Sequence, residues 1–366
     1  MTVRRSGSYP LVGKVTGVKL GLNLGYWGMN NDADNLALAR EADALGYDCA
    51  WAAEAYGSDV PTVLAWVGAQ TQRIGLGSSI MQIPARSPAM TAMTAATLDA
   101  LSGGRFRLGL GVSGPQVSEG WHGVRFDRPL ARTREYVDIV KLALARGRVR
   151  YQGEHYTLPL PDGPGKALQL TVHPVREHIP IYLASVGPKN LALTGEIADG
   201  WLAIFPSTKF VGEQLELIAA GRAKAGKSMD GFDVVASAPL VVGEDLEAAA
   251  APIRSYAALY IGGMGSREAN FYNQLATRMG FGEQAAQIQD RFMARDYQAA
   301  AAAVPFDFID STSLIGGKSR IAERLAAFAA AGVSSLNIMP HANTLADRLT
   351  ALRVAADALV ESGAAE

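Results

Sequence analysis

Three short clusters of serine, glycine and proline could hold a ligand through their peptide groups. They are Ser78-Ser79, Ser113-Gly114-Pro115 and residues 184–188, and each directly follows a short apolar run. Small residues let a ligand approach the main chain, and a glycine at a helix start leaves N–H groups free for a phosphate. The clusters therefore predict a binding site made of backbone, with a phosphate at 184–188. The alternative is that these residues only cap the elements they join.

Few side chains near these clusters could move a proton. Glu54 is the one clear carboxylate that follows an apolar run, Tyr56 comes two positions later, and His122 lies in a later loop. The five histidines lack the spacing of a metal site, and the one cysteine is Cys49. We find no G-x-S-x-G nucleophile motif and no P-loop. A site so poor in acids, bases and metal ligands is typical of an enzyme whose bound organic cofactor supplies the chemistry.

The order of apolar runs along the chain predicts how these clusters meet. Short apolar strands alternate strictly with amphipathic helices, which favours a parallel sheet. Eight such pairs favour a closed (β/α)8 TIM barrel, and the dinucleotide fingerprint of a doubly wound sheet is missing after the first strand. The active site of such a barrel lies at the carboxyl ends of its strands. The expected strands are residues 18–23, 49–53, 74–81, 106–112, 179–184, 200–205, 234–242 and 335–339.

The barrel is expected to form a single domain over residues 18–361, after an N-terminal extension of residues 1–17. Two stretches are longer than a strand-to-helix connection requires. Residues 147–178 are rich in glycine and proline and predict a loop or hairpin, whereas residues 245–318 are predicted to be mostly helical. Long insertions on a barrel commonly form lids or subunit contacts, so we expect these two to shape the substrate pocket.

Charge and composition exclude several classes of function. The 366 residues include 34 basic and 35 acidic side chains, and this balance gives no field that would hold nucleic acid or an acidic membrane. No apolar run is long enough to span a bilayer, and the first twenty residues lack the apolar core of a signal peptide. A single cysteine suits a reducing compartment. We therefore expect a cytoplasmic protein that acts on a small molecule.

Four blocks of sequence resemble the luciferase-like superfamily. They cover residues 19–28 (KLGLNLGYWG), 76–123, 129–141 and 182–201 (YLASVGPKNLALTGEIADGW). Within the superfamily they are most similar to the coenzyme F420-dependent oxidoreductases, which are related to methylenetetrahydromethanopterin reductase. The resemblance extends over residues 19–360 and is weakest between 245 and 318. It implies a barrel that forms a homodimer or a higher homo-oligomer and transfers a hydride between coenzyme F420 and a carbonyl, imine or activated alkene.

The resemblance also implies roles for single residues. In relatives, a bulge at the end of strand three holds a non-prolyl cis peptide against the back of the deazaflavin ring, and this position matches Ser79-Ile80. Relatives carry an acidic residue where Glu54 lies, but the histidine that often follows is Ala55 here. The proton donor is therefore open between Glu54, Tyr56 and His122. The implied cofactor-binding residues are Asn23, Glu54, Ser79, Ile80, Met81, Ser113, Gly114, Gln116, Ala184, Ser185, Val186, Gly187 and Pro188.

Two other groups of side chains are candidates for the substrate and for the anionic tail of F420. The aromatic residues Tyr26, Trp27 and Trp121 are expected to wall the substrate pocket. Lys189, Lys209, Arg86 and Arg125 are the candidates to bind the tail.

Two further functions fit the same sequence. A monooxygenase that uses reduced FMN shares the barrel and the phosphate site, although Ala55 in place of the histidine argues mildly against it. A catalytically silent cofactor-binding protein would carry the same features, because a fold and a ligand site do not guarantee turnover.

Overall fold

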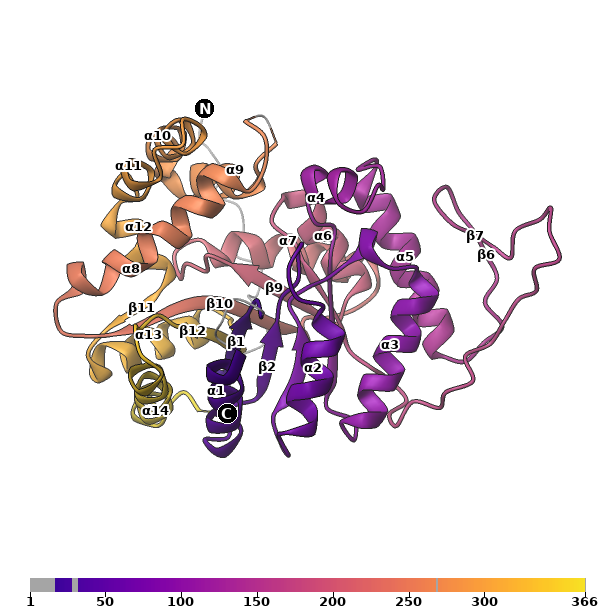
Figure 1. The fold of residues 1–366 in the computed structure, drawn as a ribbon, viewed down its shortest axis with the longest axis horizontal. Coiled ribbons are helices and arrows are strands. Elements are labelled where there is room, and N and C mark those ends of the chain that lie inside the picture. The colour runs from indigo at the N-terminus through magenta and orange to yellow at the C-terminus, as the bar shows by residue number, and fades with distance from the viewer. Residues whose placement is uncertain (1–16, 28–31, 268, 366) are drawn as a thin grey trace, which may run out of the picture.

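The computed structural model describes residues 17–27, 32–267 and 269–365, so most of the predicted N-terminal extension lies outside the described residues. Within them, eight parallel strands close into a barrel, because β9 pairs with β10 and β12 pairs with both β10 and β1 (Figure 1). This confirms the predicted (β/α)8 TIM barrel. In order around the barrel the strands are β1 (Lys19–Gly25), β2 (Cys49–Ala52), β3 (Gly75–Ser78), β5 (Phe106–Gly111), β8 (Ile181–Ala184), β9 (Gly200–Ile204), β10 (Asp233–Val242) and β12 (Ser335–Pro340).

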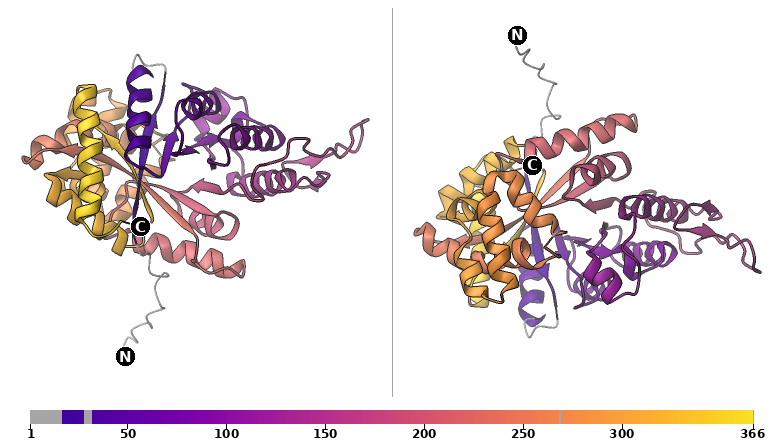
Figure 2. Two further views of the ribbon diagram at one scale, coloured as in Figure 1. Left: turned by 90° about the horizontal axis from the view of Figure 1, so that it is seen from below. Right: turned by 90° about the horizontal axis from the view of Figure 1, so that it is seen from above.

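Helices surround the strands on the outside of the barrel (Figure 2). Local sequence signals fix several of their starts. The Asp59 carboxylate accepts a hydrogen bond from Thr62 N at the start of α2, and Ser87 caps α3 in the same way. Proline occupies the first turn of both helices, where no backbone donor is needed. The barrel helices are α1 (Asp32–Ala44), α2 (Val60–Ala69), α3 (Pro88–Leu101), α5 (Pro129–Leu144), α6 (Pro188–Ile197), α7 (Val211–Lys224), α13 (Lys318–Ala330) and α14 (Leu345–Glu361).

Large side chains fill the barrel interior, and glycines on neighbouring strands make room for them. The rings of Trp51 and Tyr182 meet edge to face with centroids 5.3 Å apart. A Cβ atom on Gly77 would lie 2.2 Å from the Trp51 ring, so the glycine inside β3 is a requirement of close packing. Ile80 and Ala184 pack on this interior cluster from the ends of their strands. These two half-buried side chains form a floor at the carboxyl end of the barrel.

The two long connections differ in character. Residues 147–178 form an arm that projects from the barrel and contains the antiparallel pair of β6 (Tyr151–Gln152) and β7 (Thr157–Leu158) (Figure 1). Residues 245–318 are mostly helical and precede α13. Their elements are α8 (Leu246–Ala258), the π-helix η2 (Leu259–Gly263), α9 (Phe271–Ala276), the π-helix η3 (Thr277–Phe281), α10 (Gly282–Met293), α11 (Tyr297–Ala302), α12 (Phe306–Thr312) and β11 (Leu314–Gly316).

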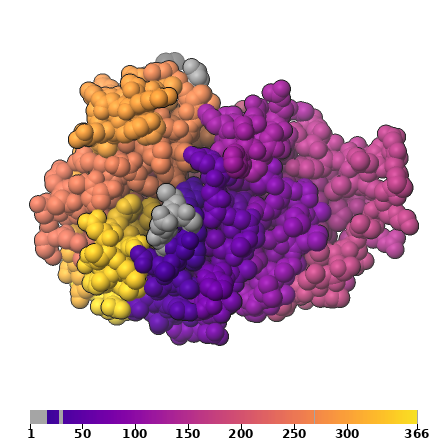
Figure 3. Space-filling view, viewed as in Figure 1, coloured from indigo at the N-terminus to yellow at the C-terminus, as the bar shows by residue number. Residues whose placement is uncertain are grey.

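The helical insertion has its own hydrophobic core, which is joined to the barrel at the ends of two strands. Phe205, directly after β9, is buried in this second core together with Ile261 and Phe308, and Val186 after β8 packs against it. In the space-filling view, the insertion forms a continuous lobe above the strands (Figure 3). The lobe therefore lies over part of the barrel end at which the predicted site residues are found. Among the described residues, no helix combines the length and the apolar character needed to cross a bilayer.

Candidate functional site

Strand three ends in a bulge around Ser79-Ile80, the position at which the resemblance implied one, so the run 74–81 does not form one continuous strand. Regular pairing between β3 and β5 stops at Gly77 and resumes at Met81, in the two-residue strand β4 (Met81–Gln82). Three residues, 78–80, therefore lie opposite two residues of β5, 108–109. The chain after β3 has one extra residue, which defines a β-bulge. The peptide bond between Ser79 and Ile80 is cis.

The Ser78 side chain holds the bulge in place. Its hydroxyl donates to Gly109 O and accepts from Gly109 N, both at 2.8 Å, and so replaces the missing strand pairing. Ser79 N donates to Ala52 O of the neighbouring strand at 2.7 Å. A Cβ atom on Gly109 would lie 1.9 Å from Ser78 O, so a glycine is required opposite the bulge. These hydrogen bonds and the close approach at Gly109 thus fix the positions of Ser79 and Ile80.

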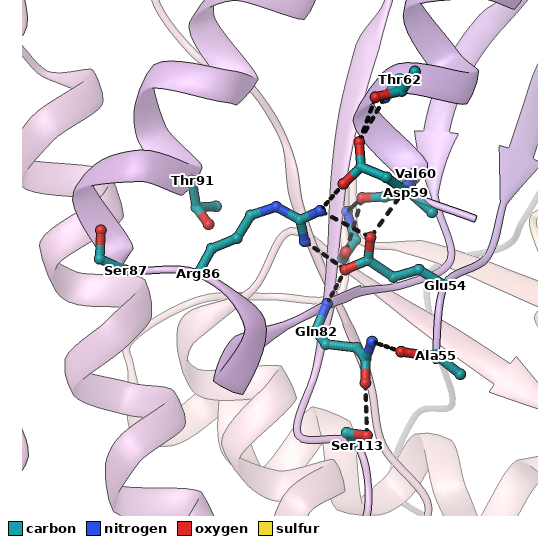
Figure 4. A network of polar contacts seen from close by, with 12 residues as sticks. Glu54, Ala55, Asp59, Val60, Thr62, Gln82, Arg86, Ser87, Thr91 and Ser113 are labelled. Atoms are coloured by element: carbon teal, nitrogen blue, oxygen red, sulfur yellow. Dashed lines mark hydrogen bonds and ion pairs between the residues drawn. The ribbon is translucent and has the colours of Figure 1, made fainter. Parts of the chain in front are cut away.

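Gln82 ties three of the strand-end loops together (Figure 4). Its Nε2 donates to Ala55 O at 2.6 Å, and its Oε1 accepts from Ser113 Oγ at 2.9 Å. Ser113 has φ of 60°, in the left-handed region, and leads through Gly114 into the short helix α4 (Pro115–Gly120). The structure therefore brings the predicted Ser79 and Ser113 clusters to neighbouring loops of one polar network. Gln116, by contrast, is exposed on α4.

Glu54 is the anchor of this network (Figure 4). Its Oε1 accepts from Arg86 Nη1 at 2.5 Å and from Gln82 N at 2.9 Å. Its Oε2 accepts from Arg86 Nη2 at 3.0 Å and from Val60 N at 3.1 Å. The side chain is nearly buried, and Arg86 also pairs with Asp59. Both oxygens are thus occupied by structural partners, and Arg86, a candidate for the F420 tail, is instead committed to this ion pair.

The other two candidate proton donors lie apart from Glu54. Tyr56 is 69% exposed at the rim, beside Gly57. His122 follows α4, and its Nε2 is buried with no hydrogen-bond partner among the described residues. Neither hydrogen bonds nor ring contacts join Glu54, Tyr56 and His122 in the described part of the chain. The structure therefore does not assemble these three side chains into one acid–base group.

The start of α6 has the character of a phosphate site. Its N-cap, Gly187, offers no capping side chain, and a Cβ atom there would meet no other atom within 4 Å. No side chain caps the first turn, and the positive end of the helix favours an anion there. Arg278 of η3 reaches this turn and donates to Val186 O at 2.9 Å. The Ser185 hydroxyl points away from the turn and accepts from Thr194 Oγ1 at 2.8 Å.

The remaining predicted residues line the same end of the barrel. The Asn23 side chain accepts a hydrogen bond from Gly25 N at 2.8 Å, which shapes the end of β1. Trp27 is buried, whereas Trp121 is 67% exposed. Lys189 and Lys209 are exposed charges near the starts of α6 and α7. Across the described residues, no three His, Cys, Asp or Glu side chains converge as a metal site requires.

Sequence analysis missed a group of aromatic residues in the helical insertion. Tyr256 and Tyr260 lie in α8 and η2 with ring centroids 4.9 Å apart, and Tyr272 meets Tyr260 at 4.9 Å. His341, directly after β12, lies 6.0 Å from Tyr256, and burial lowers the pKa of this histidine to about 4. The available signal was the spacing of four between Tyr256 and Tyr260, which places both on one face of a helix.

The comparisons with known proteins agree with this geometry. The family model for luciferase-like monooxygenase matches residues 21–335. A Mycobacterium tuberculosis protein, provisionally named a coenzyme F420-dependent oxidoreductase, is 45% identical over 87% of this chain and 94% of its own length. The 5,10-methylenetetrahydromethanopterin reductase of Archaeoglobus fulgidus is 31% identical over 81% of this chain and 86% of its own length.

A solved structure shares the fold. The coenzyme F420 dependent tetrahydromethanopterin reductase from Methanopyrus kandleri aligns with a TM-score of 0.80 at 24% identity. The alignment covers 94% of this chain and 99% of that chain.

Proposed function

Because this chain belongs to the luciferase-like monooxygenase family and to its coenzyme F420-dependent oxidoreductases, we propose that it transfers a hydride between F420 and a small organic substrate. The substrate class we propose is a carbonyl, an imine or an activated alkene. The observation that carries the proposal is the pairing of an uncapped α6 start with the Ser78–Ile80 bulge at one end of the barrel. A phosphate site and a flat apolar floor together fit a ribityl phosphate and a tricyclic ring.

The residues present fit a deazaflavin cofactor. The N–H groups of Gly187 and Lys189 would hold its phosphate, and the half-buried Ile80 and Ala184 would support its ring. Ser113 and Gly114 follow the neighbouring strand β5, whereas Met81 lies in β4 with its side chain fully buried in the core. When bound, F420 supplies a ring carbon that gives or accepts a hydride. The protein's part is then to fix both reactants in line and to supply or remove one proton.

The helical insertion supports an acceptor pocket of aromatic character. Tyr26 and Tyr260 lie where the lobe meets the barrel, and neither carries a charge that would attract an ionic substrate. Aromatic rings at this junction exclude water from the reacting atoms and favour planar carbonyl or alkene groups. We therefore propose a neutral, planar acceptor rather than a phosphorylated or strongly anionic one.

The proposal is tested by following the oxidation of reduced F420 by the purified protein with a panel of ketones, aldehydes, imines and enones. We expect at least one acceptor to raise the oxidation rate well above the rate without acceptor. A protein that binds F420 but shows no acceptor-dependent oxidation across the panel would support the silent-binder alternative instead.

We also propose that the protein is a cytoplasmic homodimer. Its one cysteine is buried and free, which is compatible with a reducing compartment. Light scattering on the eluting protein should give twice the mass of one chain. A mass of one chain at all concentrations tested would contradict the dimer.

A further inference from the structure

Two polar side chains of neighbouring strands are hydrogen bonded to each other inside the barrel. Asn337 Nδ2, from β12, donates to Ser237 Oγ, from β10, at 3.2 Å. The two residues are direct partners in the parallel register of these strands. The Asn337 side chain is fully buried, whereas Ser237 is half-buried. Neither residue was among the candidates from the sequence, because each stands within a strand rather than after it.

Strand register places Ser237 on the inner face of the barrel, one step above the floor. Val235 belongs to the interior cluster on which the floor residues Ile80 and Ala184 pack. Ser237 follows Val235 by two residues, and alternate residues of a strand share one face. Val235 pairs with Leu202, and Leu202 pairs with Ala184, so these three residues form one layer. Because Val235 is fully buried, the exposed part of Ser237 lies on the carboxyl side of this layer, as the floor does.

The order of the strands puts Ser237 opposite the bulge that holds Ile80. Around the barrel, β5, β8 and β9 separate β3 from β10 in one direction, and β2, β1 and β12 separate them in the other. A barrel of this size has an interior wide enough for side chains or for one small ligand. A ring supported on the bulge therefore turns its other face toward β10. A molecule stacked on that face would lie between the ring and Ser237.

The surroundings of Asn337 decide which end of its amide meets Ser237. On its other side Asn337 pairs with Gly21 of β1, and a Cβ atom on Gly21 would lie 3.3 Å from Trp51 Nε1. Asn337 Oδ1 and Trp51 Nε1 are both buried without a hydrogen-bond partner among the described residues. An indole N–H group can only donate, so the amide oxygen belongs on this side and the amide nitrogen on the side of Ser237. The reverse orientation would turn two donors toward each other.

This orientation leaves the Ser237 proton for a ligand. A serine hydroxyl has one proton to donate and two lone pairs that accept, and Asn337 Nδ2 occupies one lone pair. Within the described ranges, no residue accepts a hydrogen bond from Ser237. Its neighbours on the inner face are apolar, namely Ile204, which pairs with Ser237, and Met339, two residues after Asn337. A single donor among apolar side chains is the arrangement that orients a small neutral ligand.

We propose that Ser237 donates a hydrogen bond to the carbonyl oxygen of the substrate, an inference that rests on the proposed F420-dependent hydride transfer. It narrows the substrate class to molecules that contain a neutral carbonyl group. An isolated alkene and a protonated imine have no lone pair that could accept this bond. Asn337 is a positioning residue, because it acts on the substrate only through Ser237.

The test uses benzaldehyde and styrene, two planar molecules of nearly the same shape, of which only benzaldehyde has a carbonyl oxygen. Their binding to the protein loaded with oxidised F420, which has no hydride to give, is measured by calorimetry. Ser237→Ala removes the hydroxyl, and Ser237→Thr keeps it. Ser335→Ala is the matched control, because Ser335 lies one step deeper on the same face of β12 as Asn337 and its buried hydroxyl has no partner among the described residues. F420 affinity is measured on every protein by fluorescence.

We expect Ser237→Ala to bind benzaldehyde about tenfold more weakly than the wild type, because the carbonyl oxygen is then left without its donor. Its affinity for styrene should change by less than about twofold, since styrene accepts no such bond. Ser237→Thr should keep most of the benzaldehyde affinity, and Ser335→Ala should match the wild type with both probes. Asn337→Leu keeps the side-chain volume and frees the hydroxyl to rotate, so it should weaken benzaldehyde by a smaller factor and leave styrene unchanged. F420 affinity should be the same in all these proteins.

Equal benzaldehyde affinity of the wild type and Ser237→Ala, including no binding by either, would overturn the assignment of Ser237. An equal loss of benzaldehyde and styrene affinity would also overturn it, because that result indicates a packing defect. A loss of F420 affinity in Ser237→Ala would assign the hydroxyl to the cofactor and would likewise contradict the proposal.

Failure of the wild type to bind F420 would instead remove the proposed function. The calorimetry is then repeated without cofactor, and the difference between benzaldehyde and styrene still decides whether Ser237 donates to a carbonyl oxygen.

Discussion

At the scale of single residues, the ion pair between Arg86 and Glu54 shows how a residue can serve a site without taking part in chemistry. Their side chains are 14% and 5% exposed, and together they fix the ends of β2 and β4. A carboxylate held by four donors defines where the neighbouring backbone lies. The acidic residue at position 54 is therefore best understood as a structural part of the cofactor cradle.

Removing one partner of this pair should be costly. We expect Arg86→Met to lower the free energy of unfolding by about 3 kcal/mol, because Glu54 stays nearly buried without its cation. Urea denaturation measures the loss. Arg125→Met is the control, since that side chain is 85% exposed and should change stability by less than about 0.5 kcal/mol. Equal effects in the two variants would contradict the structural role.

His341 should make the fold sensitive to acid. Burial lowers its pKa from 6.5 to about 4, so between these values the unfolded chain binds a proton that the folded protein does not. Its contribution is present above pH 6.5 and is lost as the pH falls toward 4, by up to roughly 3 kcal/mol. His341→Gln should flatten this part of the stability profile. His173→Gln, at an exposed position, should leave the profile unchanged.

The positions of some single residues in the site could be predicted from the sequence, whereas their long-range contacts could not. Ser79, Ser113 and Gly187 could be predicted because each stands at the end of a run whose pattern is local. The contact of Tyr260 with Phe205 could not, because the two residues are far apart in the sequence and no periodicity connects them. The role of Arg86 was missed for the same reason, since its charge is compensated only after β2 and β4 come together.

At the scale of elements, the bulge after β3 interrupts the pairing of this strand with β5 between Gly77 and Met81. The apolar run over 74–81 predicts a strand, and only the resemblance implied a bulge at Ser79-Ile80; the structure has β3, a three-residue bulge and β4. Alternation alone cannot reveal such a break, because the residues on both sides remain apolar. The only sign of the bulge in the neighbouring strand is Gly109, because a larger residue there would collide with Ser78 O.

Filling that space should disrupt the bulge. Gly109→Ala would place its Cβ 1.9 Å from a backbone oxygen that cannot rotate away, and we expect a loss of about 3 kcal/mol in stability together with weakened F420 binding. Thermal and urea unfolding report the first effect. Gly163→Ala, in the arm, has no atom within 4 Å of the new Cβ and should behave like the wild type. A stable Gly109→Ala protein would contradict the packing described here.

The start of α6 allows a test of phosphate binding that does not depend on turnover. Gly187 has extended backbone angles and open space, so Asp and Asn both fit as N-caps. Gly187→Asp adds a carboxylate that repels a phosphate, and F420 affinity should fall by at least about tenfold while stability is kept or slightly raised. Gly187→Asn caps the helix without charge and should lose less. Unchanged F420 affinity in Gly187→Asp would place the phosphate elsewhere.

At the scale of the whole molecule, the barrel and the lobe differ in how far the sequence predicts them. Strand alternation made the barrel predictable, because each βα unit carries the same local pattern. The internal arrangement of residues 245–318 was not predictable, since its helices pack on one another and on Phe205 through contacts with no sequence period. The proposed cofactor site thus follows from the regular part of the chain, and the aromatic cluster around Tyr260 comes from the irregular part.

A fluorescence titration of the purified protein with F420 and, separately, with FMN decides which cofactor this barrel binds. We expect saturable binding of F420 and FMN binding that is at least about tenfold weaker. The Gly187→Asp protein should bind F420 more weakly in the same assay. Tight binding of FMN with no binding of F420 would contradict the central claim.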